Sequence, residues 1–176
     1  MVDNNMMPEG MMTSQMSAPQ GNPLAKHLRQ PKIYIKLPSK GQFWPNGALA
    51  IEETGEYPVY AMTARDEITF KTPDALLNGQ ATVDVIQSCL PSIKDAWQTP
   101  SIDLDAILIA IRMASFGDML DMSIKVPGTD IDKDFQFNLQ QLYDSYINTT
   151  YEDTFAIDGF NVKIKPINYK AMTTQA

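Results

Sequence analysis

The stretch SIDLDAILIAIRMASFG, residues 101–117, gives the strongest helical signal in this 176-residue chain. Ser101 is placed to cap the helix, Asp103 and Asp105 lie near its positive end, and Gly117 is placed to end it. Apart from these two acids and one arginine, the helix carries no charge and is apolar nearly all round. Such a helix is buried in the middle of a domain or an assembly, and this one is shorter than the ~20 residues that a membrane span needs.

Arg112 is the unusual residue of this helix. A guanidinium beside a core needs a carboxylate or carbonyl partner, because burying it alone costs several kcal/mol. We expect a structural ion pair with Asp66 or Glu67. The alternative is an arginine that binds an anion.

Upstream of the helix, the sequence predicts short elements. KIYIKLP (residues 32–38) alternates as a strand does, and residues 48–62 read as two short strands around a turn at Thr54–Gly55. TARDEITF begins with a capping-box pattern of Thr63 and Asp66, which favours a short helix over a third strand.

Two more helices are expected before the central one. TPDALLNG places Thr72 at an N-cap and Gly79 just after a helix end. Residues 82–90 form the next helix, which Pro91 ends. Cys89 falls on its apolar face, so we expect this thiol in the core rather than as a nucleophile.

Downstream, strands are expected near residues 122–126 and 135–139, joined by a turn at Pro127–Gly128. LQQLYDSYI, beginning at Leu139, has helical spacing. TFAIDGFNVKIKP is a hairpin whose two alternating runs are joined by Asp158–Gly159, a preferred type I′ pair.

The sequence therefore predicts the α+β class, with short antiparallel strands and hairpins around a buried central helix. One compact domain spans residues 31–170, between a flexible N-terminal arm (residues 1–30) and a flexible C-terminal tail (residues 171–176). The expected structural core includes Cys89, Ile107, Leu108, Ile111, Arg112 and Phe116.

The arm is rich in methionine, since six of the 11 methionines fall within its first 16 residues. Its few β-branched side chains cannot bury enough surface to offset the entropy of ordering. Methionine suits adaptable contacts, so the arm is either a floppy tail or a segment that orders against a partner. The candidate partner-interface residues of the chain are Met6, Met7, Met11, Met12, Leu24, Leu28, Lys36, Lys40, Phe43 and Trp44.

The stretch LPSKGQFWPNG, residues 37–47, places Phe43 and Trp44 among prolines, glycines and polar residues. Turn residues at this density normally mark a solvated loop. The two aromatic side chains either fold back as a lid on the edge of the core or anchor a partner.

The net charge of −7 hides an asymmetry. Residues 1–51 hold five basic and two acidic residues (5 − 2 = +3), whereas residues 52–176 hold nine basic and 19 acidic residues (9 − 19 = −10). The basic segment 26–40 is a weak footprint for nucleic acid, because the acidic body would repel phosphate. An arm that binds a partner or docks on its own chain is favoured.

The residues of familiar catalytic and metal sites are missing. Cys89 and His27 are the only cysteine and histidine, which excludes an intramolecular disulfide, a cysteine-only metal site and a histidine pair. No glycine-rich phosphate loop or GxSxG elbow occurs. DIDKD (residues 130–134) resembles a calcium loop, but Phe135 and Gln141 stand where an EF-hand needs glycine and glutamate. We expect no catalytic, metal or cofactor site, and hence no enzyme.

No apolar run is long enough to span a membrane, and the N-terminus lacks the pattern of a secretory signal. A protein made and used in a reducing cytosol is expected.

Three stretches occur in the order found in phage T4-type baseplate proteins, which this chain resembles over about residues 37–120, with a weaker echo in DGFNVKIKP. They are LPSKGQFWPNG, VYAMTARDEITFKTPDALLNGQATVDVIQSCLPSI and DLDAILIAIRMASFGDML. The family pattern is matched at Leu37–Gly41, Phe43–Pro45, Met62–Glu67, Leu77–Gly79, Val85–Cys89 and Ile107–Gly117.

The resemblance implies a non-enzymatic part of the baseplate hub of a contractile-tailed phage, held in several symmetric copies. Its partners would be other hub proteins, with tape-measure or tail-tube proteins as further candidates. It would be present in the host cytoplasm during assembly and then in the baseplate of the virion.

Two alternatives stay open. One is a hub assembly chaperone that is absent from the virion, and the other, from a different class, is a small nucleic-acid-binding regulator that uses residues 26–40. Many relatives place a Cys-Pro-x-Cys-like segment after the buried helix, where this chain has IKVPGTD. No metal or redox role therefore carries over.

Overall fold

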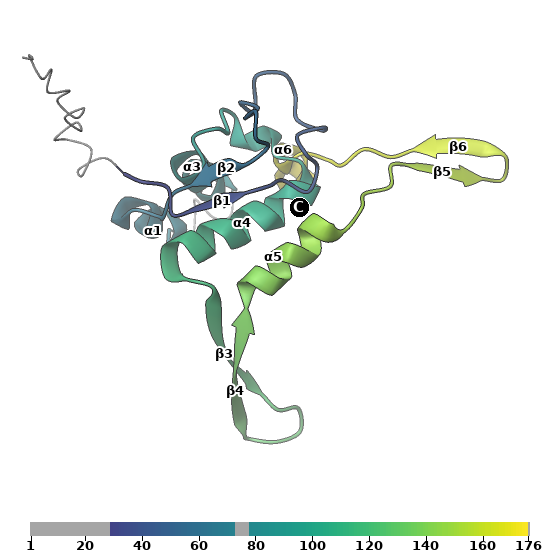
Figure 1. Ribbon diagram of the computed structural model, residues 1–176. Helices are drawn as coiled ribbons and strands as arrows, with labels where there is room; N and C mark the ends of the chain where they lie inside the picture. Colours follow the sequence, from purple (N-terminus) through teal and green to yellow (C-terminus); the bar gives the residue numbers. More distant parts are fainter. Residues whose placement is uncertain (1–28, 73–77, 176) are drawn as a thin grey trace, which may run out of the picture.

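Helix α4 (Ser101–Phe116) runs through the centre of the body, as the sequence predicts (Figure 1). The computed structural model describes residues 29–72 and 78–175. The fold is α+β, as expected, with helices and three two-stranded antiparallel sheets in the described part. The other elements, in chain order, are β1 (Ile33–Ile35), β2 (Tyr57–Val59), α1 (Ala64–Phe70), α3 (Gln80–Cys89), the 3₁₀ turn η2 (Ala96–Gln98), β3 (Met119–Lys125), β4 (Asp132–Asn138), α5 (Leu139–Asn148), β5 (Thr154–Ile157), β6 (Phe160–Lys163) and α6 (Tyr169–Gln175).

The core is built on one broad stripe of α4. Leu104, Ile107, Ile111 and Ala114 are buried, and their spacing of three or four residues places them on one side of the helix. Helices α3, α5 and α6 and strands β1 and β2 all contact α4. Cys89 of α3 belongs to the same buried cluster.

Three residues expected in the core differ from that expectation. Phe116 is 53% exposed, and Leu108 and Arg112 are only partly buried. Phe116 is the last residue of α4, where the helix leaves the body.

The expected ion pair of Arg112 with Asp66 or Glu67 is wrong. Its guanidinium instead lies over the ring of Phe116, 4.5 Å from the ring centroid, because residues four apart meet on one face of a helix. The Nη1 atom of Arg112 is buried and has no hydrogen-bond partner among the residues that the structure describes.

The strand pairing predicted within residues 48–62 is also wrong. Strand β2 pairs with β1 instead, with Ile33 opposite Val59, while Leu49 forms an isolated bridge with Ile93. The turn before β2 does form, with Gly55 at φ 68°. A local turn signal fixed the bend, but strand pairing depends on residues distant in the sequence.

The helix ends show which capping predictions hold. The capping box of α1 is present, since Thr63 N–H donates to Asp66 Oδ2 at 2.7 Å and the Thr63 hydroxyl accepts from Asp66 N–H at 3.3 Å. Ser101 does not cap α4; it is the first helical residue, and its N–H donates to Ile167 O at 2.8 Å.

The remaining expectations fall into three groups. Helix α3 and the two downstream hairpins form close to the predicted positions, and Asp158 and Gly159 both have the positive φ that a type I′ turn requires. The helix expected between Thr72 and Gly79 lies mostly in residues 73–77, outside the described residues. Residues 171–175, expected in a tail, lie in α6.

Helix α6 packs back on the body. The ring of Tyr169 stacks on Trp97 of η2 with centroids 5.7 Å apart. Gly79, which precedes α3, has φ 77° and faces α6 so closely that an added Cβ would lie 2.8 Å from Thr173 Cγ2. Position 79 therefore needs glycine both for its backbone conformation and for space.

We expect Gly79→Ala to destabilise the fold more than Gly55→Ala. Both glycines have positive φ, which costs alanine about 1–2 kcal/mol, but only Gly79 has no room for a Cβ, which adds about 1–3 kcal/mol. Urea unfolding of the two variants measures the difference. Equal losses of stability would show that α6 does not pack against Gly79.

Candidate interaction surfaces

The loop of residues 37–47 is held by one buried carboxylate. Asp103, in the first turn of α4, has an exposed fraction of 0%. It accepts hydrogen bonds from Ser39 N–H at 2.8 Å, from the Ser39 hydroxyl at 2.5 Å and from the Trp44 indole N–H at 2.7 Å. Burial raises the pKa of Asp103, and these hydrogen bonds oppose that rise.

Trp44 is therefore an internal residue rather than an interface anchor. It is 9% exposed, and its polar atom is bound inside the chain. Of the two roles expected for Trp44, the structure supports the one in which its side chain folds back on the core rather than anchoring a partner. The indole supplies a donor that the buried carboxylate needs. Phe43 is half-buried and meets Tyr151 edge to face, with ring centroids 5.3 Å apart.

The basic segment is partly occupied by contacts within the chain. Arg29 donates to Ser88 O at 2.7 Å and to Ala61 O, and lies 3.7 Å from Asp66 Oδ2. Burial alone would raise the pKa of Asp66, but hydrogen bonds from Thr63 and Ser88 and the Arg29 charge bring it below its ordinary value. Residue 29, expected in the arm, is thus attached to the body.

The other candidate interface residues are dispersed. Lys36 and Lys40 are both exposed, and Lys36 lies 3.7 Å from Glu56 in an exposed ion pair, a kind that contributes little to stability. The arm candidates lie outside the described residues; they are Met6, Met7, Met11, Met12, Leu24 and Leu28.

One exposed apolar surface lies on the hairpin of β3 and β4. Residues directly opposite one another share a face of a hairpin, and the register pairs Leu120 with Phe137 and Met122 with Phe135. Ile124 lies on the same face by alternation. Lys133 also lies on this face, opposite Ile124, and the other face is polar except for Met119. Four of the five apolar side chains are exposed, and Leu120 is partly buried.

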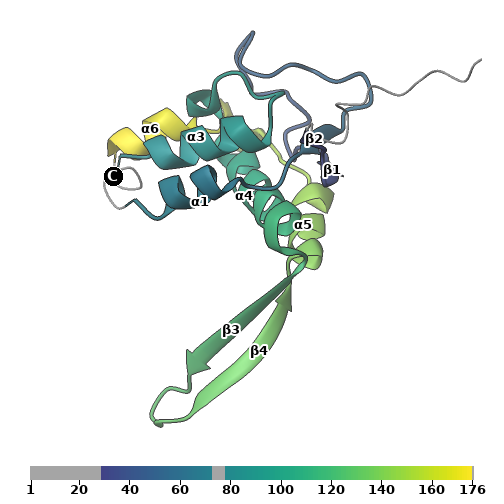
Figure 2. The same ribbon diagram turned by 90° about the vertical axis from the view of Figure 1, so that its left-hand side faces the viewer.

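The hairpin of β5 and β6 repeats this design. Phe155 pairs with Val162, and Ile157 pairs with Phe160, so the four side chains share one face. All four are exposed, and Phe160 reaches 74%. Both hairpins extend away from the body in different directions (Figure 1), and Figure 2 shows the β3–β4 hairpin from another side.

The sequence predicted both hairpins but not that their apolar faces are uncovered. A contiguous exposed apolar face marks an interaction site, and an isolated two-stranded hairpin is only marginally stable in water. We name the two surfaces the β3–β4 face (Leu120, Met122, Ile124, Phe135, Phe137) and the β5–β6 face (Phe155, Ile157, Phe160, Val162).

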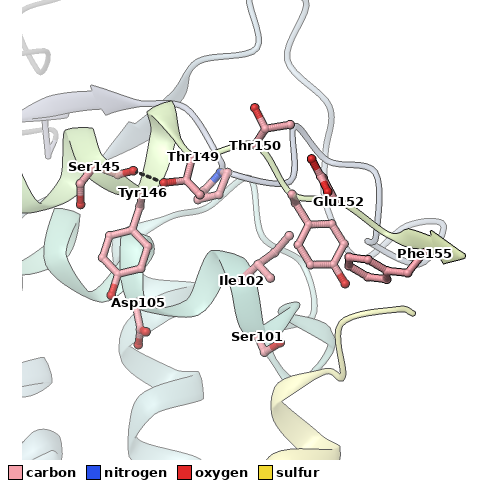
Figure 3. Close-up of a pocket in the computed structure, with 11 residues that line it drawn as sticks. Ser101, Ile102, Asp105, Ser145, Tyr146, Thr149, Thr150, Glu152 and Phe155 are labelled. Atoms are coloured by element: carbon pink, nitrogen blue, oxygen red, sulfur yellow. Dashed lines mark hydrogen bonds between the residues drawn. The ribbon is translucent and has the colours of Figure 1, made fainter. Parts of the chain in front are cut away.

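An open groove of about 640 Å³ lies where α4 begins and α5 ends (Figure 3). Ile102, Tyr146 and Phe155 supply apolar lining, and Asp105 and Glu152 supply two carboxylates. Its lining includes no histidine, cysteine, lysine or arginine.

Within residues 29–72 and 78–175, no cluster of three metal-ligating side chains occurs. Burial raises the pKa of Cys89 to about 11, so its thiol is protonated at neutral pH. No helix of the described part is long and apolar enough to cross a membrane.

Trp44→Phe tests the role of the loop. The change leaves the Asp103 carboxylate one donor short in a buried site, so we expect a loss of about 1–3 kcal/mol in the free energy of unfolding. Trp97→Phe is the matched control, because it removes the same atoms from a stacked ring whose indole N–H makes no hydrogen bond within the described residues. Urea unfolding compares them, and an equal loss in both would argue against the carboxylate bond.

Comparison with known proteins gives one match. The family model described as T4 bacteriophage base plate protein matches residues 30–175, nearly the whole described part. No curated protein and no solved structure matches the chain. Because the matched region covers most of the sequence, this chain belongs to the family of T4 bacteriophage base plate proteins.

Proposed function

We propose that this chain is a non-enzymatic structural component of the hub of a contractile phage baseplate, and that it binds neighbouring tail proteins through its two hairpin faces. The observation that carries the proposal is the contrast between a closed body and two uncovered apolar hairpins. Family membership supports a structural role in the baseplate.

The energetics favour this use of the hairpins. Each Leu, Ile, Val, Met or Phe side chain that a partner covers fully contributes about 1.5–3 kcal/mol. Nine such residues stand on the two faces, so that partial burial is enough for a stable contact. The neighbours would be other hub proteins, with tape-measure and tail-tube proteins as further candidates, met in the host cytoplasm and retained in the virion.

The electrostatics argue against a nucleic-acid regulator. Arg29 is bound by Ser88 and Asp66, and Lys36 lies beside Glu56. Those basic groups therefore already face acids of their own chain, and the acidic body would repel phosphate.

Mass spectrometry of purified phage particles tests the proposed function. We expect the chain in a fixed ratio to other baseplate proteins, since a structural component stays in the particle. A particle that lacks the chain would support an assembly chaperone instead.

A variant pair tests the hairpin contact. Ile157→Ser/Phe160→Ser removes two apolar side chains from the β5–β6 face, and we expect incorporation into particles to fall at least about tenfold. Thr154→Ser/Ala156→Ser alters the polar face of the same hairpin and should leave incorporation unchanged. Thermal unfolding of both proteins checks that the body is intact. Normal incorporation of the first variant would contradict the contact.

A further inference from the structure

We propose that copies of this chain join edge to edge, with β6 of one copy pairing antiparallel with β4 of the next. The two hairpins would then form one four-stranded sheet in the order β3, β4, β6, β5. The inference rests on the proposed function and deepens it, because it names a second copy of the chain as the neighbour at these hairpins.

Both strands have an edge available for pairing. Each hairpin is a two-stranded sheet, so no further strand of the described chain covers the outer side of β4 or β6. Val126 N–H donates to Ile131 O at 3.0 Å, and Ile164 N–H donates to Asp153 O at 2.7 Å. Hydrogen-bonded and non-hydrogen-bonded pairs alternate along an antiparallel ladder, so these bonds define which backbone groups point outward.

The outward residues carry opposite charges on the two strands. On β4 they are Asp132, Asp134 and Gln136, and on β6 and the residues just after it they are Asn161, Lys163 and Lys165. One antiparallel register sets Asp132 opposite Lys165, Asp134 opposite Lys163, and Gln136 opposite Asn161. The outward backbone groups of these three residues on β4 then meet those of the three residues of the partner copy.

The charged groups are available for this contact. Neither Asp132 nor Asp134 makes an ion pair within the described residues, and Lys165 makes none there either. Lys163 lies 3.1 Å from Asp153, but its side chain is 73% exposed and the pair is solvated. Such an exposed pair exchanges easily for a new one.

The same register joins the apolar faces. Alternation places Phe135 opposite Val162 and Phe137 opposite Phe160 on the other side of the sheet. The β3–β4 face and the β5–β6 face thereby become one continuous apolar surface. The pairing of β4 with β6 thus forms backbone hydrogen bonds, sets opposite charges together and keeps the apolar side chains on one side of the sheet.

Other edge pairs fit less well. Two β4 edges would bring aspartates together, and two β6 edges would bring lysines together, which is unfavourable. The outward residues of β5, Thr154 and Ala156, carry no charge, and those of β3 offer one acid and one base, Asp121 and Lys125. The combination of β4 with β6 gives two opposite-charge pairs and no like-charge pair.

The pairing must occur between copies. The two hairpins leave the body in different directions (Figure 1). Each copy offers one β4 edge and one β6 edge, so the contact is head to tail and forms a ring if its rotation closes.

Charge reversal tests the pairing in the full chain. In sedimentation velocity at low salt we expect concentration-dependent association of the wild-type chain. Asp132→Lys/Asp134→Lys and Lys163→Glu/Lys165→Glu should each weaken it at least tenfold. Mixing these two variants should restore association, because each presents the charges that the other lacks. Glu53→Lys/Asp144→Lys is the control for the aspartate variant, since it changes the net charge by the same amount and sign at exposed positions of the body.

Disulfide cross-linking tests the proposed register between β4 and β6. Phe135→Cys/Val162→Cys places the thiols directly opposite one another between copies, so oxidation should give a ladder of cross-linked chains on a non-reducing gel. Phe137→Cys/Val162→Cys shifts one thiol by two residues and should give little cross-linking.

Two results would overturn the inference: a wild-type chain that stays monomeric and gives no ladder, or a mixture of reversed variants that fails to associate. Particles that contain the chain despite such results would leave the proposed function standing. Pairing by a chain that is absent from particles would overturn the proposed function alone.

Discussion

The buried carboxylate of Asp103 is the constraint on which the body depends. A carboxylate without exposed surface must be hydrogen-bonded. Asp103 accepts its hydrogen bonds from Ser39 and Trp44. The loop that follows β1 is therefore bound to the first turn of α4. Tyr143 of α5 adds a second tie, because its hydroxyl accepts from Lys36 N–H and donates to Lys36 O, both at 2.8 Å. Removing either tie leaves polar groups unpaired inside the protein.

These ties also place the hairpins. Strand β3 begins three residues after α4 ends, and β4 passes directly into α5. Leu139 N–H donates to Asp118 O at 2.8 Å, which closes the base of the hairpin between the two helices. The β3–β4 hairpin is thus anchored at both ends to helices of the core. A rigid body can present such a surface at a defined angle, although the hairpin itself has no cover.

Local patterns predicted much of this fold, whereas side-chain partners were beyond them. Helix periodicity, the Thr63 capping box and the Asp158–Gly159 turn act within a few residues, so the sequence reveals them. An aspartate near a helix N-terminus looks the same whether it faces solvent or binds Trp44, and only tertiary packing separates the two. Asp66 was expected to pair with Arg112 but lies beside Arg29 instead. Which of the two cations meets this acid depends on chain segments that are far apart in the sequence. The sequence predicted both downstream hairpins, but it could not show that each leaves an apolar face uncovered.

An uncovered edge strand invites unwanted pairing, and the charges on these hairpins limit it. Aspartates along β4 repel a second β4, and lysines along β6 repel a second β6, so identical edges stay apart. The favourable pairing joins the β4 edge to the β6 edge. It also requires the apolar faces to lie on the same side of the sheet and the outward backbone groups to lie opposite one another. In the proposed pairing, a hairpin that is marginal alone gains strands, buried apolar surface and ion pairs in the same step. Assembly of the copies would therefore stabilise the hairpins that the body presents.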